Sequence, residues 1–186
     1  ASIRSELSIP MIGVEPGIKP AAMQTQNGVV GVLATEATLK SDKFNALLAT
    51  LPESCKLIKQ AGAGLVPLIE SGQIESAEMR SLLQSYLQTI VAGQADTLVL
   101  GCTHYPFLKK QIHELIGNSI NLIDTSDAVV RQLGRQLEQH QLQSSSDTPT
   151  LNLLSTANAD TLHAMAIRLL QTDVSKHKMS KQTVQI

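Results

Sequence analysis

Cys102 is the side chain in this sequence best suited to nucleophilic or acid–base chemistry. It follows an apolar run at 97–101 and precedes a helical stretch, which predicts a strand-to-helix junction. Backbone N–H groups and the helix dipole at such a junction stabilise a thiolate. His104, two residues on, is placed to exchange a proton with that thiol. The alternative is a small apolar cysteine that ends a core strand.

Glu70 and two threonines are further candidates. Glu70 ends the apolar run 65–69, where a carboxylate would orient a histidine or have a shifted pKa; a solvated glutamate at a helix end is the alternative. Thr35 and Thr38 follow another apolar run and could bind a substrate carboxylate. They could also cap the next helix, and the two roles can coexist. A third polar segment, 124–126, follows a later strand.

Several other functions are disfavoured. The formal net charge of -1 removes the main electrostatic driver of nucleic-acid binding. No apolar run has the length of a membrane helix, and no secretion signal opens the chain, so we expect a cytoplasmic protein with free thiols. The histidines lack metal-ligand spacing, which predicts no metal site, and Pro67 interrupts a glycine pattern of the dinucleotide-binding type. Cys55, at the start of a weak strand, is predicted to be structural.

Short apolar runs alternate with helical stretches along the chain. Such alternation predicts an α/β fold with a mainly parallel, doubly wound sheet. Strands are expected at 9–14, 28–34, 55–58, 97–101, 120–123 and 151–154, and helices at 39–50, 65–71, 74–91, 107–116, 126–140 and 160–170. The segment 141–150 is predicted to be a loop and the tail after Gln171 to be frayed. Ligands of open α/β sheets bind at the carboxyl ends of the strands, where Thr35, Cys102 and Asp124 are expected to meet.

The segment 100–106, Leu-Gly-Cys-Thr-His-Tyr-Pro, resembles the second-cysteine motif of the glutamate racemase family within the aspartate/glutamate racemase superfamily. Further segments that match the family in the same order lie at 12–21, 33–41, 65–70 and 121–126. Aspartate racemases typically carry Glu where this chain has His104, which favours the glutamate branch. The resemblance covers residues 9 to about 140.

The resemblance implies a cofactor-independent, two-base interconversion of L- and D-glutamate for bacterial peptidoglycan synthesis and cell shape. One cysteine removes the α-proton, and a thiol on the other face returns one. Cys102 matches the family's second cysteine, His104 the residue that assists it and lines the substrate site, and Glu70 a carboxylate near that histidine. Thr103, with Thr35 and Thr38, matches groups that hold the substrate.

The departures from the family concern its first lobe. The family has two α/β lobes with the site between them, and the first lobe carries an Asp-Ser motif, a Pro-Tyr-Gly segment and the first cysteine. None of these motifs occurs in the 186 residues. The resemblance therefore implies that 1–8 is a remnant of the first lobe, 9–123 the complete second lobe, and 124–186 the closing segment of the first. Position 62 also departs, with Gly where many members have Cys.

Three hypotheses follow. The leading one is a glutamate racemase whose 186 residues alone have little or no activity, because the first catalytic cysteine is absent. The second is a single-cysteine relative of the aryl-malonate decarboxylase type. The third is a non-catalytic binding or interaction module, whose exposed first-lobe surface would be an interface. That surface also makes a homodimer possible.

Overall fold

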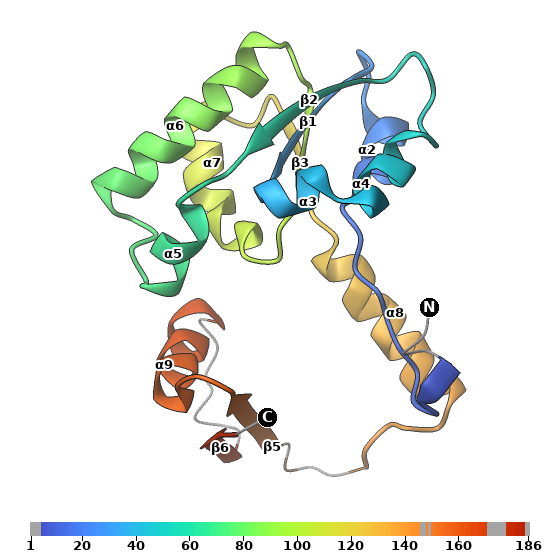
Figure 1. Ribbon diagram of the computed structural model, residues 1–186, viewed down its shortest axis with the longest axis vertical. Coiled ribbons are helices and arrows are strands. Elements are labelled where there is room, and N and C mark those ends of the chain that lie inside the picture. The colour runs from blue at the N-terminus through green and yellow to red at the C-terminus, as the bar shows by residue number, and fades with distance from the viewer. Residues whose placement is uncertain (1–4, 146–147, 149, 171–177, 185–186) are drawn as a thin grey trace.

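The computed structural model describes residues 5–145, 148, 150–170 and 178–184. Within these residues a four-stranded sheet has the order β2-β1-β3-β4, and all of its pairs are parallel. The strands are β1 (Val29–Ala34), β2 (Lys56–Ala61), β3 (Thr97–Leu100) and β4 (Asn121–Ile123). Figure 1 shows this sheet with helices on both faces. The predicted α/β fold with a mainly parallel sheet is confirmed.

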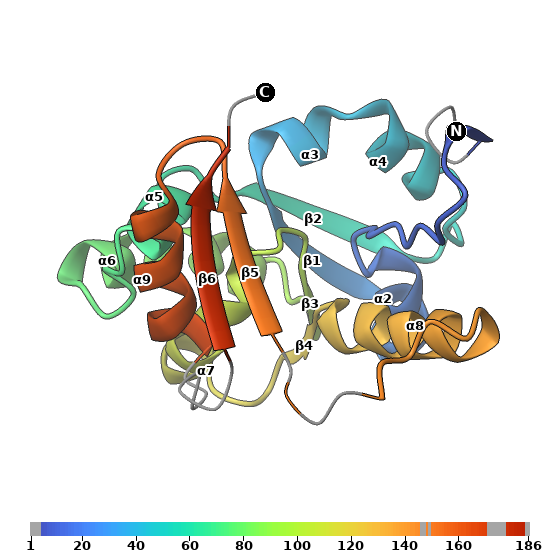
Figure 2. The ribbon, with the colours of Figure 1, turned by 90° about the horizontal axis from the view of Figure 1, so that it is seen from below.

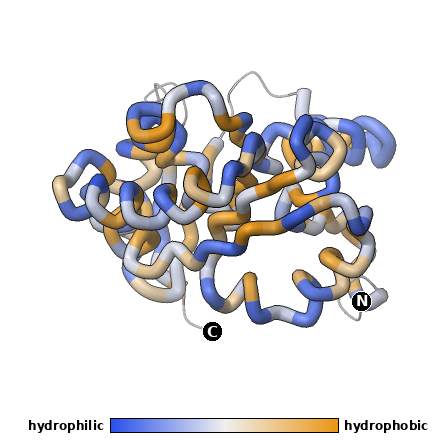
Figure 3. Tube along the Cα trace, turned by 90° about the horizontal axis from the view of Figure 1, so that it is seen from above, coloured by the Kyte–Doolittle hydropathy of each residue, from blue (hydrophilic) through white to orange (hydrophobic). Residues whose placement is uncertain are grey.

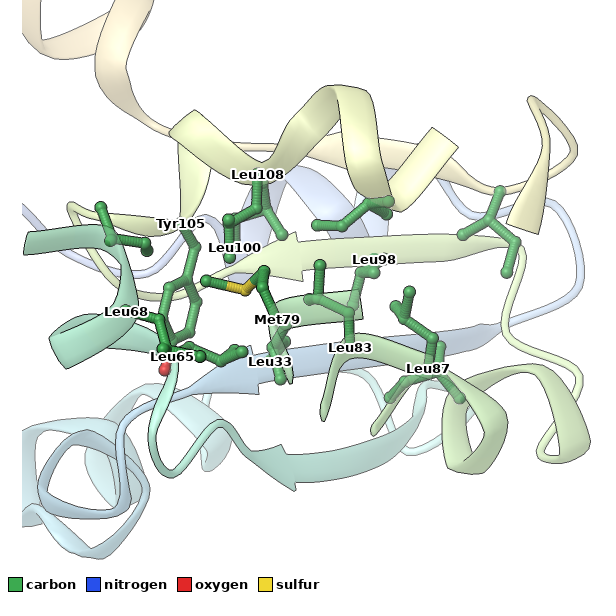
Figure 4. Close-up of a cluster of buried hydrophobic side chains, with 14 of the residues drawn as sticks. Leu33, Leu65, Leu68, Met79, Leu83, Leu87, Leu98, Leu100, Tyr105 and Leu108 are labelled. Atoms are coloured by element: carbon green, nitrogen blue, oxygen red, sulfur yellow. The ribbon is translucent and has the colours of Figure 1, made fainter. Parts of the chain in front are cut away.

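Two apolar clusters sandwich the sheet. One contains side chains of α5 (Leu65–Glu70), α6 (Ala77–Ala92) and α7 (Lys109–Ile116), and it is drawn in Figure 4. The other contains side chains of α2 (Ile18–Gln24) and α4 (Asp42–Leu48), with α3 (Glu36–Lys40) beside it. β1 serves both clusters by alternation, with Leu33 in the first and Val30 and Val32 in the second. Accordingly, the apolar colour of Figure 3 gathers in the central strands.

Gly31 allows α6 to lie close to the sheet. A Cβ at this position would come within 2.6 Å of the Ile90 Cγ2 atom, a fully buried side chain of α6. Such an overlap forces the helix outward or distorts a packed core. The absence of a side chain at residue 31 therefore sets the distance between this layer and the strands that carry the candidate site.

The chain leaves the sheet through α8 (Ser126–Gln139) and ends in a separate unit. There β5 (Thr150–Ser155) pairs in parallel with β6 (Lys178–Thr183), and α9 (Ala159–Leu170) packs on both strands. Figure 2 shows β5 and β6 side by side, and Figure 1 shows them apart from the larger sheet. No described residue of α8 is fully buried, and Val130 and Leu133 are exposed. The exposed apolar surface predicted for the late segment is present on α8.

Three predicted elements differ in the structure. The strand predicted at 9–14 is wrong: these residues have no regular structure, and Ile12 lies against the start of α8. Pro10 removes a backbone donor, so an apolar run alone does not make a strand there. The helix predicted at 39–50 is broken at Ser41, whose hydroxyl caps α4. The tail after Gln171 is predicted to be frayed, but it contains the strand β6. Its polar sequence does not indicate a strand, because the strand is held by pairing with β5. Residues 171–177 lie outside the described ones.

Asp96 fixes the loop at the amino end of the sheet. Its carboxylate accepts hydrogen bonds from the Thr25 hydroxyl at 2.6 Å and from the amides of Gln26 and Asn27 at 2.7 and 2.8 Å. Burial alone would raise the pKa of Asp96, but these hydrogen bonds outweigh burial and hold the pKa below its usual range. The charged carboxylate is therefore the form that stabilises the fold.

We expect Asp96→Asn to lower the free energy of unfolding by about 1–2 kcal/mol at pH 7, since an amide cannot accept all of these hydrogen bonds. Because the folded pKa lies below the unfolded value of about 3.9, the stabilisation is present above that value and is lost as the pH falls through the folded pKa. Urea titrations at pH 7 and pH 3 measure this, with exposed Asp127→Asn as the control. An equal loss at both pH values would contradict the assignment.

Candidate functional site

Cys102 lies two residues beyond the end of β3, at the carboxyl edge of the sheet. Gly101, between them, donates its amide to the Leu33 carbonyl at 2.8 Å, which extends the β1–β3 ladder up to the cysteine. A turn and the 3-10 helix η1 (Tyr105–Leu108) follow, and α7 begins only at Lys109. The expected position after a buried strand is thus confirmed. The α-helix N-terminus predicted directly beside the thiol is not there.

A chain of side-chain contacts joins Cys102, His104 and Glu70. The Cys102 Sγ atom lies 3.8 Å from His104 Nδ1, and His104 Nε2 lies 3.1 Å from Glu70 Oε1. When Nε2 donates its proton to the carboxylate, Nδ1 is the acceptor that faces the thiol. The order thiol, imidazole, carboxylate is the one that activates a cysteine nucleophile or base. Glu70 comes from the last residue of α5, 34 positions away in the sequence.

The His104–Glu70 pair is open to solvent on one side. The side chain of Glu70 is 58% exposed and that of His104 is 33% exposed. Water screens an ion pair of this kind, so its contribution to stability is small. The role of the contact is therefore to orient the imidazole ring.

Thr35 and Thr38, two of the predicted substrate-binding residues, lie at this edge of the sheet and bind each other. Thr35 follows β1, whose Leu33 pairs with Leu100 of β3, so it lies at the strand end next to that of Cys102. Its hydroxyl accepts from the Thr38 amide at 3.2 Å and lies 2.9 Å from the Thr38 hydroxyl. The predicted capping role is therefore confirmed for Thr35, which caps α3, whereas Thr38 lies inside that helix. Substrate binding by this pair stays a prediction.

The polar segment after β4 has a structural partner that the sequence did not indicate. Lys109 forms an ion pair with Asp124, and the Ser126 amide donates to the same carboxylate at 2.7 Å. Burial raises the pKa of Asp124, but the Lys109 and Ser126 hydrogen bonds outweigh it and lower the pKa below its usual range. Asp124 is thus a buried structural anion at the start of α8, and it is not joined to Cys102.

A cavity of about 690 Å³ adjoins the site. Its polar end is formed by Glu70, Thr103 and His104, and its apolar wall by α9 with Leu162 and Met165. Arg168 of α9 donates to the Ser71 carbonyl at 3.2 Å, one residue beyond Glu70. Sequence reasoning missed this wall. The signal that could have found it is the three- and four-residue spacing of apolar side chains between 162 and 169.

Cys55 belongs to a different environment. It is half-buried and packs against the cluster of α2, α4 and β1, where burial raises the pKa of its thiol. This setting agrees with the predicted structural role. Among the described residues, no three His, Cys, Asp or Glu side chains are grouped to hold a metal ion, and no helix is long and apolar enough to cross a membrane.

The sequence profile of the Asp/Glu/hydantoin racemase family matches residues 1–133. The chain belongs to this family. Among the relatives within it, the glutamate racemase of Ralstonia pickettii is 51% identical over 168 residues, which cover 90% of this chain and 60% of the relative. The glutamate racemase of Ectopseudomonas mendocina is 44% identical over 169 residues, or 91% of this chain and 64% of the relative. The chain thus spans about three fifths of the length of these relatives.

Crystal structures of the racemase family share the fold. A glutamate racemase isoform of Bacillus anthracis superposes with a TM-score of 0.78 at 26% identity, covering 96% of this chain and 66% of that structure. Escherichia coli glutamate racemase, in complex with L-glutamate and the activator UDP-MurNAc-Ala, gives 0.76 at 27% identity, with 99% and 68% covered. The predicted membership of the aspartate/glutamate racemase superfamily is confirmed, and these relatives are named glutamate racemases.

Proposed function

We propose that this chain carries one half of the proton-transfer machinery of a glutamate racemase, with Cys102 as one of the two bases. The observation that carries the proposal is the Cys102–His104–Glu70 chain at the carboxyl edge of the sheet. Relatives of up to 51% identity are named glutamate racemases, which supports glutamate as the substrate. The product D-glutamate would serve peptidoglycan synthesis.

The proton transfers balance on these residues. The thiol proton of Cys102 moves to His104 Nδ1, and Glu70 stabilises the imidazolium that results. The thiolate then removes the α-proton of glutamate; the electron pair of the C–H bond stays on Cα and spreads into the α-carboxylate. The thiol so formed can return its proton to the same face. Thr35, Thr38 and Thr103 would hold the substrate's carboxylates; of these, Thr103 lines the cavity beside His104.

Net inversion also needs a proton donor on the opposite face of Cα. Cys55, the second thiol of the 186 residues, packs with the cluster behind the sheet and cannot serve that face. We therefore propose that these residues alone interconvert the enantiomers little or not at all. Four further points remain predictions: a cytoplasmic location, the absence of a cofactor, lobe boundaries near residues 9 and 124, and a homodimer formed through the exposed α8 surface.

The test is α-proton exchange in D₂O, followed by proton NMR with L- and D-glutamate in separate samples. A single base returns deuterium to the face from which it took the proton. We expect one enantiomer to lose its α-proton signal with retention of configuration, while the other exchanges little. Exchange of neither enantiomer would count against the proposal, and so would interconversion as fast as that of a complete family member. Chain alkylated at Cys102 is the control.

The two alternatives give different results in the same experiment. A decarboxylase-type relative would release CO₂ from an aryl malonate and leave the glutamate α-proton in place. A non-catalytic interaction module would do neither, and Cys102 would react slowly with an alkylating agent because its thiolate would be scarce. The His104–Glu70 contact favours the racemase reading, since a purely structural cysteine needs no oriented imidazole.

A further inference from the structure

Tyr105 follows His104 in the chain and is fully buried. Its hydroxyl donates a hydrogen bond to the carbonyl oxygen of Gly62 at 3.1 Å. Gly62 in turn donates its amide to the Ala34 carbonyl at 2.9 Å, so it continues the β1–β2 ladder past the end of β2. The tyrosine ring therefore ties the segment that carries His104 to backbone that the sheet holds in place.

Two consecutive residues thus bind the two ends of the segment that contains α5. Tyr105 binds Gly62, which precedes this helix, and His104 binds Glu70, its last residue. The helix between them is fixed by Leu65 and Ile69, both fully buried. Figure 4 shows Tyr105 lying against Leu65 and Leu68 of α5. Because Tyr105 and His104 are adjacent residues, a shift of the Tyr105 backbone moves the imidazole relative to Glu70.

The tie also reaches the thiol. The Tyr105 amide donates to the Cys102 carbonyl at 3.1 Å, which closes the turn between the cysteine and η1. The side chains of Cys102 and His104 therefore project from one turn whose far end is anchored by the phenol. A 3.8 Å contact between Sγ and Nδ1 depends on how that turn is held.

Gly62 and Tyr105 fit each other in this chain. A Cβ at residue 62 would lie 2.4 Å from the Tyr105 hydroxyl oxygen and 2.8 Å from Leu65 Cδ1. The ring is enclosed in the core and has no free path away from such an atom. Glycine at this position is therefore the residue that leaves room for the phenol hydroxyl.

The phenol of Tyr105 keeps its proton. Burial, and then the negative charge of the Cys102 thiolate, raise the pKa of Tyr105 above its usual range. The hydroxyl thus stays a donor to Gly62 throughout any pH range in which the protein would work.

We propose that Tyr105, matched to Gly62, is a positioning residue that holds the turn bearing Cys102 and His104 in register with Glu70. This inference rests on the proposed function of those residues as proton-transfer groups. Through its contact with Gly62, the phenol holds the His104 imidazole at a fixed position relative to the sheet. The phenol itself touches no substrate.

Tyr105→Phe tests the proposal because it removes one oxygen and keeps the ring. Tyr86→Phe is the matched control: Tyr86, the other tyrosine of the sequence, donates to the adjacent carbonyl of Ala63 at 2.8 Å but comes from α6. The readouts are the iodoacetamide alkylation rate of Cys102, with Cys55 as an internal reference, and the NMR signals of the His104 ring. Neither readout needs glutamate turnover.

We expect Tyr105→Phe to slow alkylation of Cys102 by about two- to tenfold, the population factor that one hydrogen bond supplies. The His104 ring signals should shift, and the rate at Cys55 should not change. Tyr86→Phe should leave both Cys102 and His104 as in the parent chain. Faster alkylation at both thiols would indicate general loosening of the fold and overturn the proposal, as would an unchanged Cys102 with unchanged His104 signals.

Gly62→Ala provides a second route, because it displaces the hydroxyl and leaves Tyr105 in the sequence. It should reproduce the effect of Tyr105→Phe on Cys102, whereas Gly134→Ala on α8, where a Cβ meets open space, should have none. If Gly62→Ala leaves the Cys102 rate unchanged in a folded chain, the matched pair is not what positions the turn. Lack of glutamate exchange in the parent chain would count against the proposed function only.

Discussion

Replacing Cys102 by serine is expected to lower the rate of α-proton exchange on glutamate by about 10²–10⁴-fold, the range that a positioned general base supplies. The substitution removes the thiolate and keeps the size of the side chain. A serine hydroxyl is far less acidic than a thiol, so His104, which lies 3.8 Å from the sulfur, cannot convert it to a useful base at neutral pH. The measurement is the decay of the α-proton signal in D₂O for each enantiomer.

Cys55→Ser is the control for this variant. Both changes remove one sulfur from a half-buried position, but Cys55 packs among α2, α4 and β1 on the far side of the sheet. We expect its exchange rate to equal that of the parent chain. Equal losses in the two variants would mean that the exchange does not depend on the Cys102–His104–Glu70 chain. Circular dichroism melting curves should show that both variants are folded.

The sequence predicts those parts of the site whose residues lie close together along the chain. Cys102 and His104 are neighbours in one motif, so residue types and spacing alone suggest their chemistry. Glu70 is 34 positions away, and its link to His104 came from the resemblance to a family. The structure now places the carboxylate 3.1 Å from the imidazole. The catalytic roles of all three residues remain predictions for the exchange experiments.

The parts that sequence reasoning missed are contacts between segments of weak pattern. Lys109 pairs with Asp124 across the end of the sheet. The sequence around either residue does not indicate that the other is its partner. The wall of the cavity comes from α9, about 60 residues beyond the cysteine, through the contact of Arg168 with Ser71. Apolar runs inside the sheet were predicted well because burial on both faces needs continuous hydrophobicity. The run at 9–14 has similar residues but no neighbouring strand.

Replacing Lys109 by methionine is expected to lower the free energy of unfolding by about 2–3 kcal/mol at pH 7. The side chain of Asp124 is only 7% exposed, and Lys109 supplies its cation at the point where β4 leads into α8. Methionine keeps the aliphatic stem but leaves a nearly buried carboxylate with only the amide and hydroxyl of Ser126 as the donors recorded for it. Urea unfolding of the two chains measures the loss.

The neighbouring Lys110 gives a matched control. It pairs with Glu75 at 3.3 Å, but both side chains are at least 70% exposed, so Lys110→Met should cost well under 1 kcal/mol. The double variant Lys109→Met/Asp124→Asn should recover part of the loss, since it removes the unpaired charge. Equal stabilities of Lys109→Met and Lys110→Met would contradict the role assigned to Asp124.

The pH dependence separates a lost charge from lost packing. In the parent chain the folded pKa of Asp124 lies below its unfolded value, so the pair stabilises the fold above about pH 4 and ceases to do so as the pH falls through the folded pKa. Without Lys109 the folded pKa of Asp124 rises, because only the Ser126 hydrogen bonds then oppose the effect of burial. The stability difference between the parent chain and Lys109→Met should therefore be largest near neutral pH. It should shrink in acid, where Asp124 is protonated in both chains. A difference that stays constant down to pH 3 would assign the loss to packing of the lysine stem instead.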